Sequence, residues 1–153
     1  MKGLKKVFTL SFCFMIIILL VGCSKKKISM EKFRKTLEKD NFVVTDIVKS
    51  EKNGVLNFSQ ANDKDNKYQI EFYQFDNNEN AKLAFHNLRL DLYSIAVKGS
   101  TSGSIERKNY LKFVLTNDDK YYSLSLIDNT LIFAYTSLDN KSELKNIVKK
   151  LGY

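Results

Sequence analysis

The single histidine is the first residue to consider for acid–base or metal chemistry. His86 lies beside Phe85, one position off the apolar stripe of a predicted helix. A general base or a metal ligand needs partner groups within reach. No neighbouring cysteine, second histidine or EF-hand pattern accompanies His86. We therefore interpret His86 as a residue at the boundary or surface of the fold, and we predict no metal site and no cofactor.

Two polar segments have the composition of ligand loops without the spacing that such loops require. Asp63, Asp65 and Asn66 offer oxygen ligands for calcium, but an EF-hand's central glycine and closing glutamate do not follow. Residues 99–104 (GSTSGS) contain neither a P-loop lysine nor the Gly-x-Ser-x-Gly frame of a nucleophile elbow. We interpret the first segment as a solvated turn and the second as a flexible loop.

Paired carboxylates are the remaining route to catalysis. Glu71 with either Glu106 or Asp91 would make a hydrolase if the two carboxylates converged in a pocket at a suitable separation. The chain has 17 acidic residues, so a pair can be nominated easily and no motif selects one. We predict no catalytic residues and keep a carboxylate hydrolase as the alternative to a binding function.

Tyrosines on predicted strands are the feature that most favours binding. Tyr73, Tyr110 and Tyr121 fall opposite the expected apolar face of their strands. Their neighbours on that side are polar, namely Glu71, Lys112, Ser123 and Ser125. Tyrosine gives contact area together with a polar group, so these three residues are the predicted binding surface. The alternative is that tyrosines simply suit strands and half-buried sheet edges.

The first half of the chain that must position these residues has clear boundaries. Ser29 is suited to cap a helix from Met30 to about Asp40, and residues 42–48 are rich in β-branched residues, which favours a strand. Asn53-Gly54 is a hairpin signal, and the sequence after it predicts further strands at residues 55–61 and 68–75.

The second half repeats this order. Asp76 or Asn77 is expected to cap a helix from Glu79 to about Tyr93. After the predicted loop, three strands at residues 105–116, 121–127 and 131–136 lead to a last helix from Asn140 to Leu151. Hairpin-linked blocks of strands indicate an α+β fold. We expect antiparallel sheet in an α-βββ-α-βββ-α order, with the helices packed on one face.

The first 22 residues have the composition of an export signal. Lys2, Lys5 and Lys6 form a basic start, and residues 7–22 carry no charge. That run of 16 residues would span about 24 Å as a helix, short of the roughly 30 Å hydrocarbon core of a bilayer. The sequence therefore predicts a secretory signal peptide and not a permanent membrane span.

The end of this segment resembles the lipobox of bacterial lipoproteins. Leu20-Val21-Gly22-Cys23 places a leucine three residues before an invariant cysteine. The resemblance implies that the Cys23 thiol carries a diacylglycerol, that the chain is cleaved before Cys23, and that palmitate-type acyl chains hold it on the extracytoplasmic face of the cell membrane. Residues 23–28 then form a short lysine-rich tether, and residues 29–153 form one globular domain.

The size, charge and basic residues of the chain indicate which classes of partner are expected. Removal of residues 1–22 leaves 131 residues, enough for one domain with its own core, and lowers the net charge from +8 to +5. The basic residues are 22 lysines and three arginines, whereas phosphate reading in nucleic acids favours arginine. We expect no nucleic-acid partner, a monomer, membrane lipid bound through Cys23, and an envelope protein or ligand as the remaining partner.

Three longer segments resemble small uncharacterised lipoproteins of Gram-positive bacteria. They are SMEKFRKTLEKDNFVVTDI, YQIEFYQFDNNENAKLAF and DNTLIFAY with IVKKLGY. This resemblance implies the cellular location and the fold of the chain, and it implies no activity. The sequence thus predicts a membrane-tethered, non-enzymatic interaction or ligand-binding module, with an envelope hydrolase or a lysine-driven membrane-surface binder as alternatives.

Overall fold

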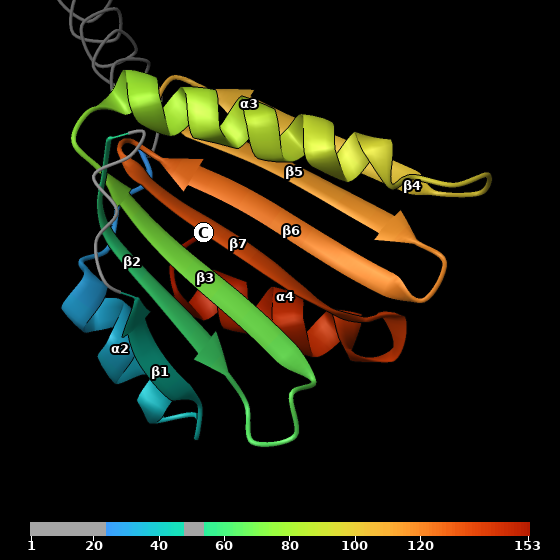
Figure 1. Cartoon of the computed structure of the whole chain (residues 1–153), viewed down its shortest axis with the longest axis horizontal. Coiled ribbons are helices and arrows are strands. Elements are labelled where there is room, and N and C mark those ends of the chain that lie inside the picture. The colour runs from blue at the N-terminus through green and yellow to red at the C-terminus, as the bar shows by residue number, and fades with distance from the viewer. Residues whose placement is uncertain (1–23, 48–53) are drawn as a thin grey trace, which may run out of the picture.

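A seven-stranded antiparallel sheet organises the chain (Figure 1). The computed structural model describes residues 24–47 and 54–153. Cys23, the predicted signal peptide at residues 1–22 and Asn53 of the predicted hairpin lie outside these residues. The strand order is β1-β2-β3-β7-β6-β5-β4, so each half of the chain forms its own meander and β3 pairs with β7 at the junction. The bounds of the strands are β1 Val43–Ile47, β2 Val55–Asn62, β3 Tyr68–Phe75, β4 Thr101–Arg107, β5 Tyr110–Asn117, β6 Lys120–Ile127 and β7 Thr130–Ser137.

Helices begin where the sequence predicts their caps. The hydroxyl oxygen of Ser29 accepts a hydrogen bond from the Lys32 amide at the start of α2 (Met30–Glu38). Asn77, one of the two predicted candidates, accepts from the Asn80 amide at the start of α3 (Asn78–Ser94). A short 3₁₀ turn, η2 (Leu138–Asn140), leads into α4 (Lys141–Lys150). No helix among the described residues is long and apolar enough to cross a bilayer.

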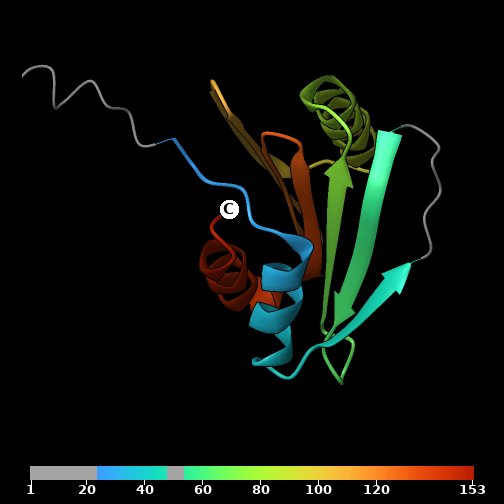
Figure 2. The ribbon, with the colours of Figure 1, turned by 90° about the vertical axis from the view of Figure 1, so that its left-hand side faces the viewer.

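The predicted α+β class with antiparallel sheet is confirmed, but the expectation that all helices share one face is wrong. α2 and α4 pack on one side of the sheet, over a core that includes Phe33, Phe72 and Leu144. α3 packs on the other side, where Phe85 joins a second core. Figure 2 shows the sheet between the two layers. The central strands are apolar at both odd and even positions because both of their faces are buried.

The predicted loop at residues 99–104 is correct only for Gly99 and Ser100, since β4 begins at Thr101. The predicted strand 105–116 is in fact two strands, β4 and β5, joined at Lys108-Asn109, so the second block has four strands. All seven residues of β4 are exposed, and its sequence lacks the alternation of a half-buried strand. Backbone pairing along the edge of β5 defines this strand, with Thr101 opposite Thr116 and Arg107 opposite Tyr110.

Ion pairs and polar contacts fasten the α2 and α4 layer. Arg34 of α2 pairs with Asp46 of β1 at 2.5 Å, and Lys150 of α4 pairs with Asp40 just after α2 at 2.6 Å. Ahead of α2, Lys27 donates to the side chain of Asn129. These contacts hold the N-terminal segment and both helices as one layer against the sheet.

We predict that Phe72→Ala lowers the free energy of unfolding by about 3–5 kcal/mol, the usual cost of emptying a buried phenylalanine site. Phe72 is fully buried, and its ring stacks on that of Phe33 at 5.2 Å between centroids. The measurement is urea unfolding followed by circular dichroism. Leu83→Ala on the outer side of α3, where Leu83 is 60% exposed, serves as the control and should change stability by less than about 0.5 kcal/mol. Equal effects of the two changes would contradict the described core.

Candidate functional site

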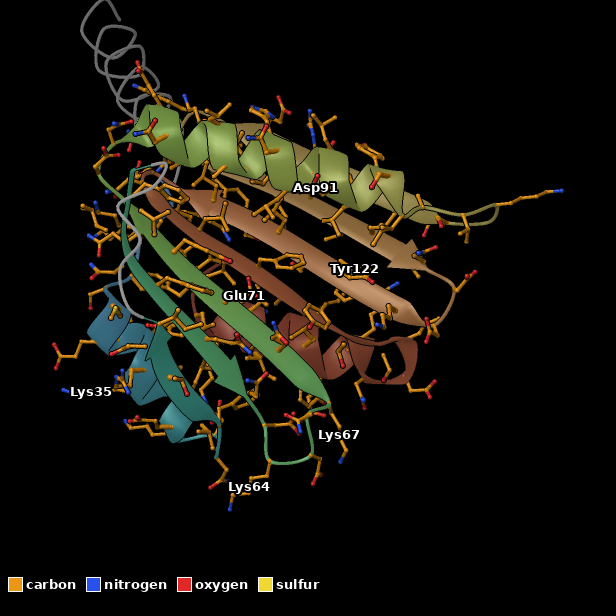
Figure 3. All side chains as sticks on the ribbon, viewed as in Figure 1. Lys35, Lys64, Lys67, Glu71, Asp91 and Tyr122 are labelled. Atoms are coloured by element: carbon orange, nitrogen blue, oxygen red, sulfur yellow. The ribbon has the colours of Figure 1, made fainter. Side chains whose placement is uncertain are left out.

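The sheet face that carries α3 is covered only in part. α3 lies over β5, β6 and the end of β3, whereas no helix of residues 24–47 and 54–153 covers the parts of β2, β3 and β7 below it on that side (Figure 1). Five half-buried aromatic residues line this uncovered part, and we call them the open aromatic face: Phe58, Tyr73, Tyr122, Phe133 and Tyr135. Figure 3 shows Tyr122 and Glu71 on this face, with Asp91 on α3 above them.

Strand register brings the five aromatic residues together. Tyr122 lies opposite Tyr135, and Tyr135 lies opposite Gln69 on the next strand. One row further along, Phe133 lies opposite Glu71. In the third row Tyr73 lies opposite Phe58. Cross-strand neighbours on one face stand about 5 Å apart, so the rings of β6 and β7 and those of β3 and β2 lie on one surface, with Gln69 and Glu71 between them.

Ring contacts group the five aromatic residues into two clusters, Phe58 with Tyr73 and Tyr122 with Phe133 and Tyr135. The rings of Phe58 and Tyr73 stack with centroids 4.5 Å apart and planes 7° from parallel. Tyr122 lies 6.4 Å from Phe133 and 5.9 Å from Tyr135. Offset and tilted contacts of this kind stabilise aromatic pairs beyond the area that they bury. The rings are therefore held in fixed positions before any ligand arrives.

A hydrogen-bond chain runs through the centre of the open aromatic face. The Tyr135 hydroxyl donates to the side-chain oxygen of Gln69, and the Gln69 amide donates to the carboxylate of Glu71. The Tyr73 hydroxyl donates to the other carboxylate oxygen of Glu71 at 2.6 Å. Burial, followed by this bond to Glu71, raises the pKa of Tyr73 far above that of a free tyrosine. At neutral pH Tyr73 is therefore a fixed donor.

The predicted surface of Tyr73, Tyr110 and Tyr121 does not exist as one site. Tyr73 lies on the open aromatic face, but Tyr110 and Tyr121 lie on the opposite side of the sheet, where they are 4% and 2% exposed. The prediction assumed that each strand has one covered face. Because α4 covers the side of β6 that was expected to be open, Tyr121 is buried there together with Ser123 and Ser125.

Four residues of the open aromatic face were not predicted from the sequence, namely Phe58, Tyr122, Phe133 and Tyr135. The only signal for them is alternation within β7, where Leu131, Phe133 and Tyr135 share one side and Ile132 and Ala134 share the other. Both sides of β7 are apolar, so alternation alone does not say which is uncovered. The path of α3 decides that, and it depends on long-range packing.

Glu71 and Glu106, one of the two nominated carboxylate pairs, do not form a catalytic pair. Four strand steps separate Glu71 on β3 from Glu106 on β4, which is about 19 Å at about 4.8 Å per step. Glu106 instead pairs with Arg89 of α3 at 3.4 Å. Asp91 is exposed on α3, and among the described residues it makes no hydrogen bond with Glu71. A carboxylate pair suited to glycoside cleavage lies within about 10 Å, so the pair with Glu106 is excluded.

The other polar candidates have structural roles. The Asp63 carboxylate accepts hydrogen bonds from the Asp65 and Tyr68 amides and so shapes the turn between β2 and β3. His86 is exposed, with its ring edge-on to Phe85. A recess of about 90 Å³ lies between the start of α3 and the β4–β5 turn, lined by Lys82, Arg107 and Asp128 among others. Its volume is enough for a few water molecules.

A double-mutant cycle on Glu71→Ala and Tyr73→Phe should give a coupling free energy of about 1 kcal/mol, the size of a hydrogen bond at a half-buried site. Each single change removes the same hydrogen bond. The double variant should therefore lose less free energy of unfolding than the sum of the losses in the two single variants. The measurement is urea unfolding at pH 7, where the Tyr73 phenol is protonated in both states. Strictly additive losses would show that the two side chains do not interact.

Comparisons with known proteins assign no family. No protein-family model matches the chain, and no curated protein matches it. Among solved structures, a GTP binding regulator from Thermotoga maritima is similar over 82% of this chain and 85% of its own, with 16% identity and a TM-score of 0.47. The extracellular domain of PknH from Mycobacterium tuberculosis is similar over 82% of this chain and 90% of its own, with 7% identity and a TM-score of 0.44.

Proposed function

We propose that this chain is a membrane-tethered, extracytoplasmic lipoprotein that acts as a non-enzymatic binding module at the cell envelope. The proposed location is supported by the basic and apolar start of the sequence and by Leu20-Val21-Gly22-Cys23. The observation that carries the binding function is the open aromatic face, with its fixed rings and its central chain of hydrogen bonds. This face replaces the surface predicted from Tyr73, Tyr110 and Tyr121.

The chemistry of the open aromatic face favours a neutral, hydroxyl-rich ligand, and we propose a glycan chain of the envelope. Ring faces offer flat apolar area that fits the C–H face of a sugar. Beside the rings, the carboxylate of Glu71 and the amides of Gln60 and Gln69 offer acceptors and donors for sugar hydroxyls. Glu71 forms no ion pair with a described lysine or arginine, which disfavours an anionic ligand at this place.

The arrangement supports binding over hydrolysis. Glu71 is the one carboxylate at the centre of the three aromatic rows, and two side-chain donors already hold its oxygens. A glycosidase needs a second carboxylate across the scissile bond. Glu106, the second acid nominated on β4, is four strands away and cannot serve as that carboxylate.

The test is binding of soluble fragments of the host's own cell-wall glycan by the full chain purified from membranes, measured by isothermal titration calorimetry. Tyr73→Ala combined with Tyr135→Ala should weaken binding about fivefold to hundredfold, because the two stacking rings together contribute about 1–3 kcal/mol and about 1.4 kcal/mol is tenfold in affinity.

The matched control is Tyr93→Ala, which removes a tyrosine that is 49% exposed on α3 and lies outside the open aromatic face. We expect this change to leave the affinity within twofold of the unchanged protein. Glycan binding that is insensitive to the Tyr73 and Tyr135 changes, or equally sensitive to the Tyr93 change, would contradict the proposed face.

A further inference from the structure

Positive side chains from three separate segments gather on the side of the sheet that carries α4. Lys25 comes from the segment before α2, Arg107 and Lys112 come from β4 and β5, and Lys141 and Lys145 come from α4. We call these five residues the lysine cradle. The segment from Ser24 to α2 runs on the same side of the sheet as α4 (Figure 2). Each of the five side chains is exposed or half-buried, so a ligand can reach them.

Two buried tyrosines form the floor of the lysine cradle. The Lys25 ammonium lies 4.2 Å from the centroid of the Tyr110 ring. The ammonium groups of Lys141 and Lys145 lie 5.1 Å and 5.6 Å from the centroid of the Tyr121 ring. Contacts between cations and ring faces hold these lysines over the sheet while they stay open to an anion on their other side. Tyr110 and Tyr121 are not part of an exposed surface, as was predicted, but they position the ammonium groups of the lysine cradle.

Three hydrogen bonds fix the cradle at its ends. The Lys25 ammonium also donates to the carbonyl of Gly152, and the backbone carbonyl of Lys25 accepts from the Asn109 side chain. At the far end, the Lys141 ammonium donates to the hydroxyl of Thr116 on β5. The N-terminal segment, β5 and α4 therefore hold their charges at set positions around Lys112.

The charge of the lysine cradle is not balanced by acidic side chains. Among the described residues none of its five members forms an ion pair. Burial, and then the nearby charges of Lys25 and Lys145, lower the pKa of Lys112. Like charges that lower one another's pKa in this way create a positive potential, which an anion between them would relieve.

We propose that the lysine cradle binds the phosphodiester headgroup of an anionic phospholipid in the membrane that holds the chain. This inference rests on the proposed lipid anchor, because Lys25 is only two residues from Cys23, at most about 7 Å of extended chain. The cradle would then lie against the bilayer. The open aromatic face, on the opposite side of the sheet, would point away from the membrane toward the envelope.

The test uses the full chain purified from membranes in a nonionic detergent, with dihexanoyl phosphatidylglycerol as the probe. Calorimetry should show binding of this lipid and neither binding of dihexanoyl phosphatidylcholine nor comparable binding of inorganic phosphate. Lys112→Gln with Lys145→Gln should weaken the binding about tenfold or more, as expected when two lysines beside an anionic headgroup are neutralised. Lys64→Gln with Lys98→Gln, two exposed lysines elsewhere, is the control with the same loss of charge and should change it less than twofold.

Equal weakening by the two double variants would overturn the proposal, because it would show a general effect of net charge. Equal binding of phosphatidylcholine, or phosphate binding as tight as that of the anionic lipid, would overturn it as well. Because Lys112 is half-buried, Lys141→Gln with Lys145→Gln on α4 repeats the test without changing the sheet, and unchanged binding in this variant would also overturn the proposal. Glycan binding measured on the same variants tests the open aromatic face separately, and intact-mass analysis tests the lipid anchor. A wrong proposal for the face or the anchor can therefore be distinguished from a wrong proposal for the lysine cradle.

Discussion

The pairing of β3 with β7 is the constraint on which the rest of the structure depends. Each half of the chain closes its own antiparallel meander, and this ladder alone joins the two meanders into one sheet, with Ile70 opposite Ala134 and Phe72 opposite Ile132. These four side chains are fully buried under α2 and α4. On the other side of the same ladder, Leu131 packs under α3. A sheet buried on both sides at its centre needs helices on both faces.

Two surfaces of different chemistry follow from this arrangement. α3 crosses the half of the sheet formed by β5 and β6 and leaves the aromatic rows on β7, β3 and β2 uncovered. On the opposite side, α4 and the segment before α2 bring ammonium groups over the rings of Tyr110 and Tyr121. One surface is aromatic with a single central carboxylate, and the other is positive, so each suits a different class of ligand.

Local chemistry made the element boundaries predictable. Ser29 and Asn77 cap their helices because short polar side chains satisfy free amides at a helix start. The alternation of Tyr68, Ile70 and Phe72 with polar residues predicted β3, because residues two apart on a strand point to the same side of the sheet. In contrast, β4 has no apolar alternation and is a strand only because β5 offers it an edge, which is a long-range contact.

The candidate site was less predictable than the fold. A tyrosine on a strand has the same local signature whether it is buried or open, and Tyr121 and Tyr122 are adjacent residues on opposite faces. Only the placement of α3 and α4 decides which of the two is accessible. Of the three predicted members, Tyr73 alone lies on the open aromatic face.

The proposed membrane anchor at Cys23 would give both surfaces their orientation. Intact-mass analysis tests this anchor most directly. The protein would be extracted from membranes of its native host, unchanged and as Cys23→Ala. The account predicts a mass that fits a chain beginning at Cys23 and carrying acyl chains, and an uncleaved chain without them for Cys23→Ala. An uncleaved and unacylated mass for the unchanged protein would contradict the account, and residues 1–22 would then have to be a transmembrane anchor.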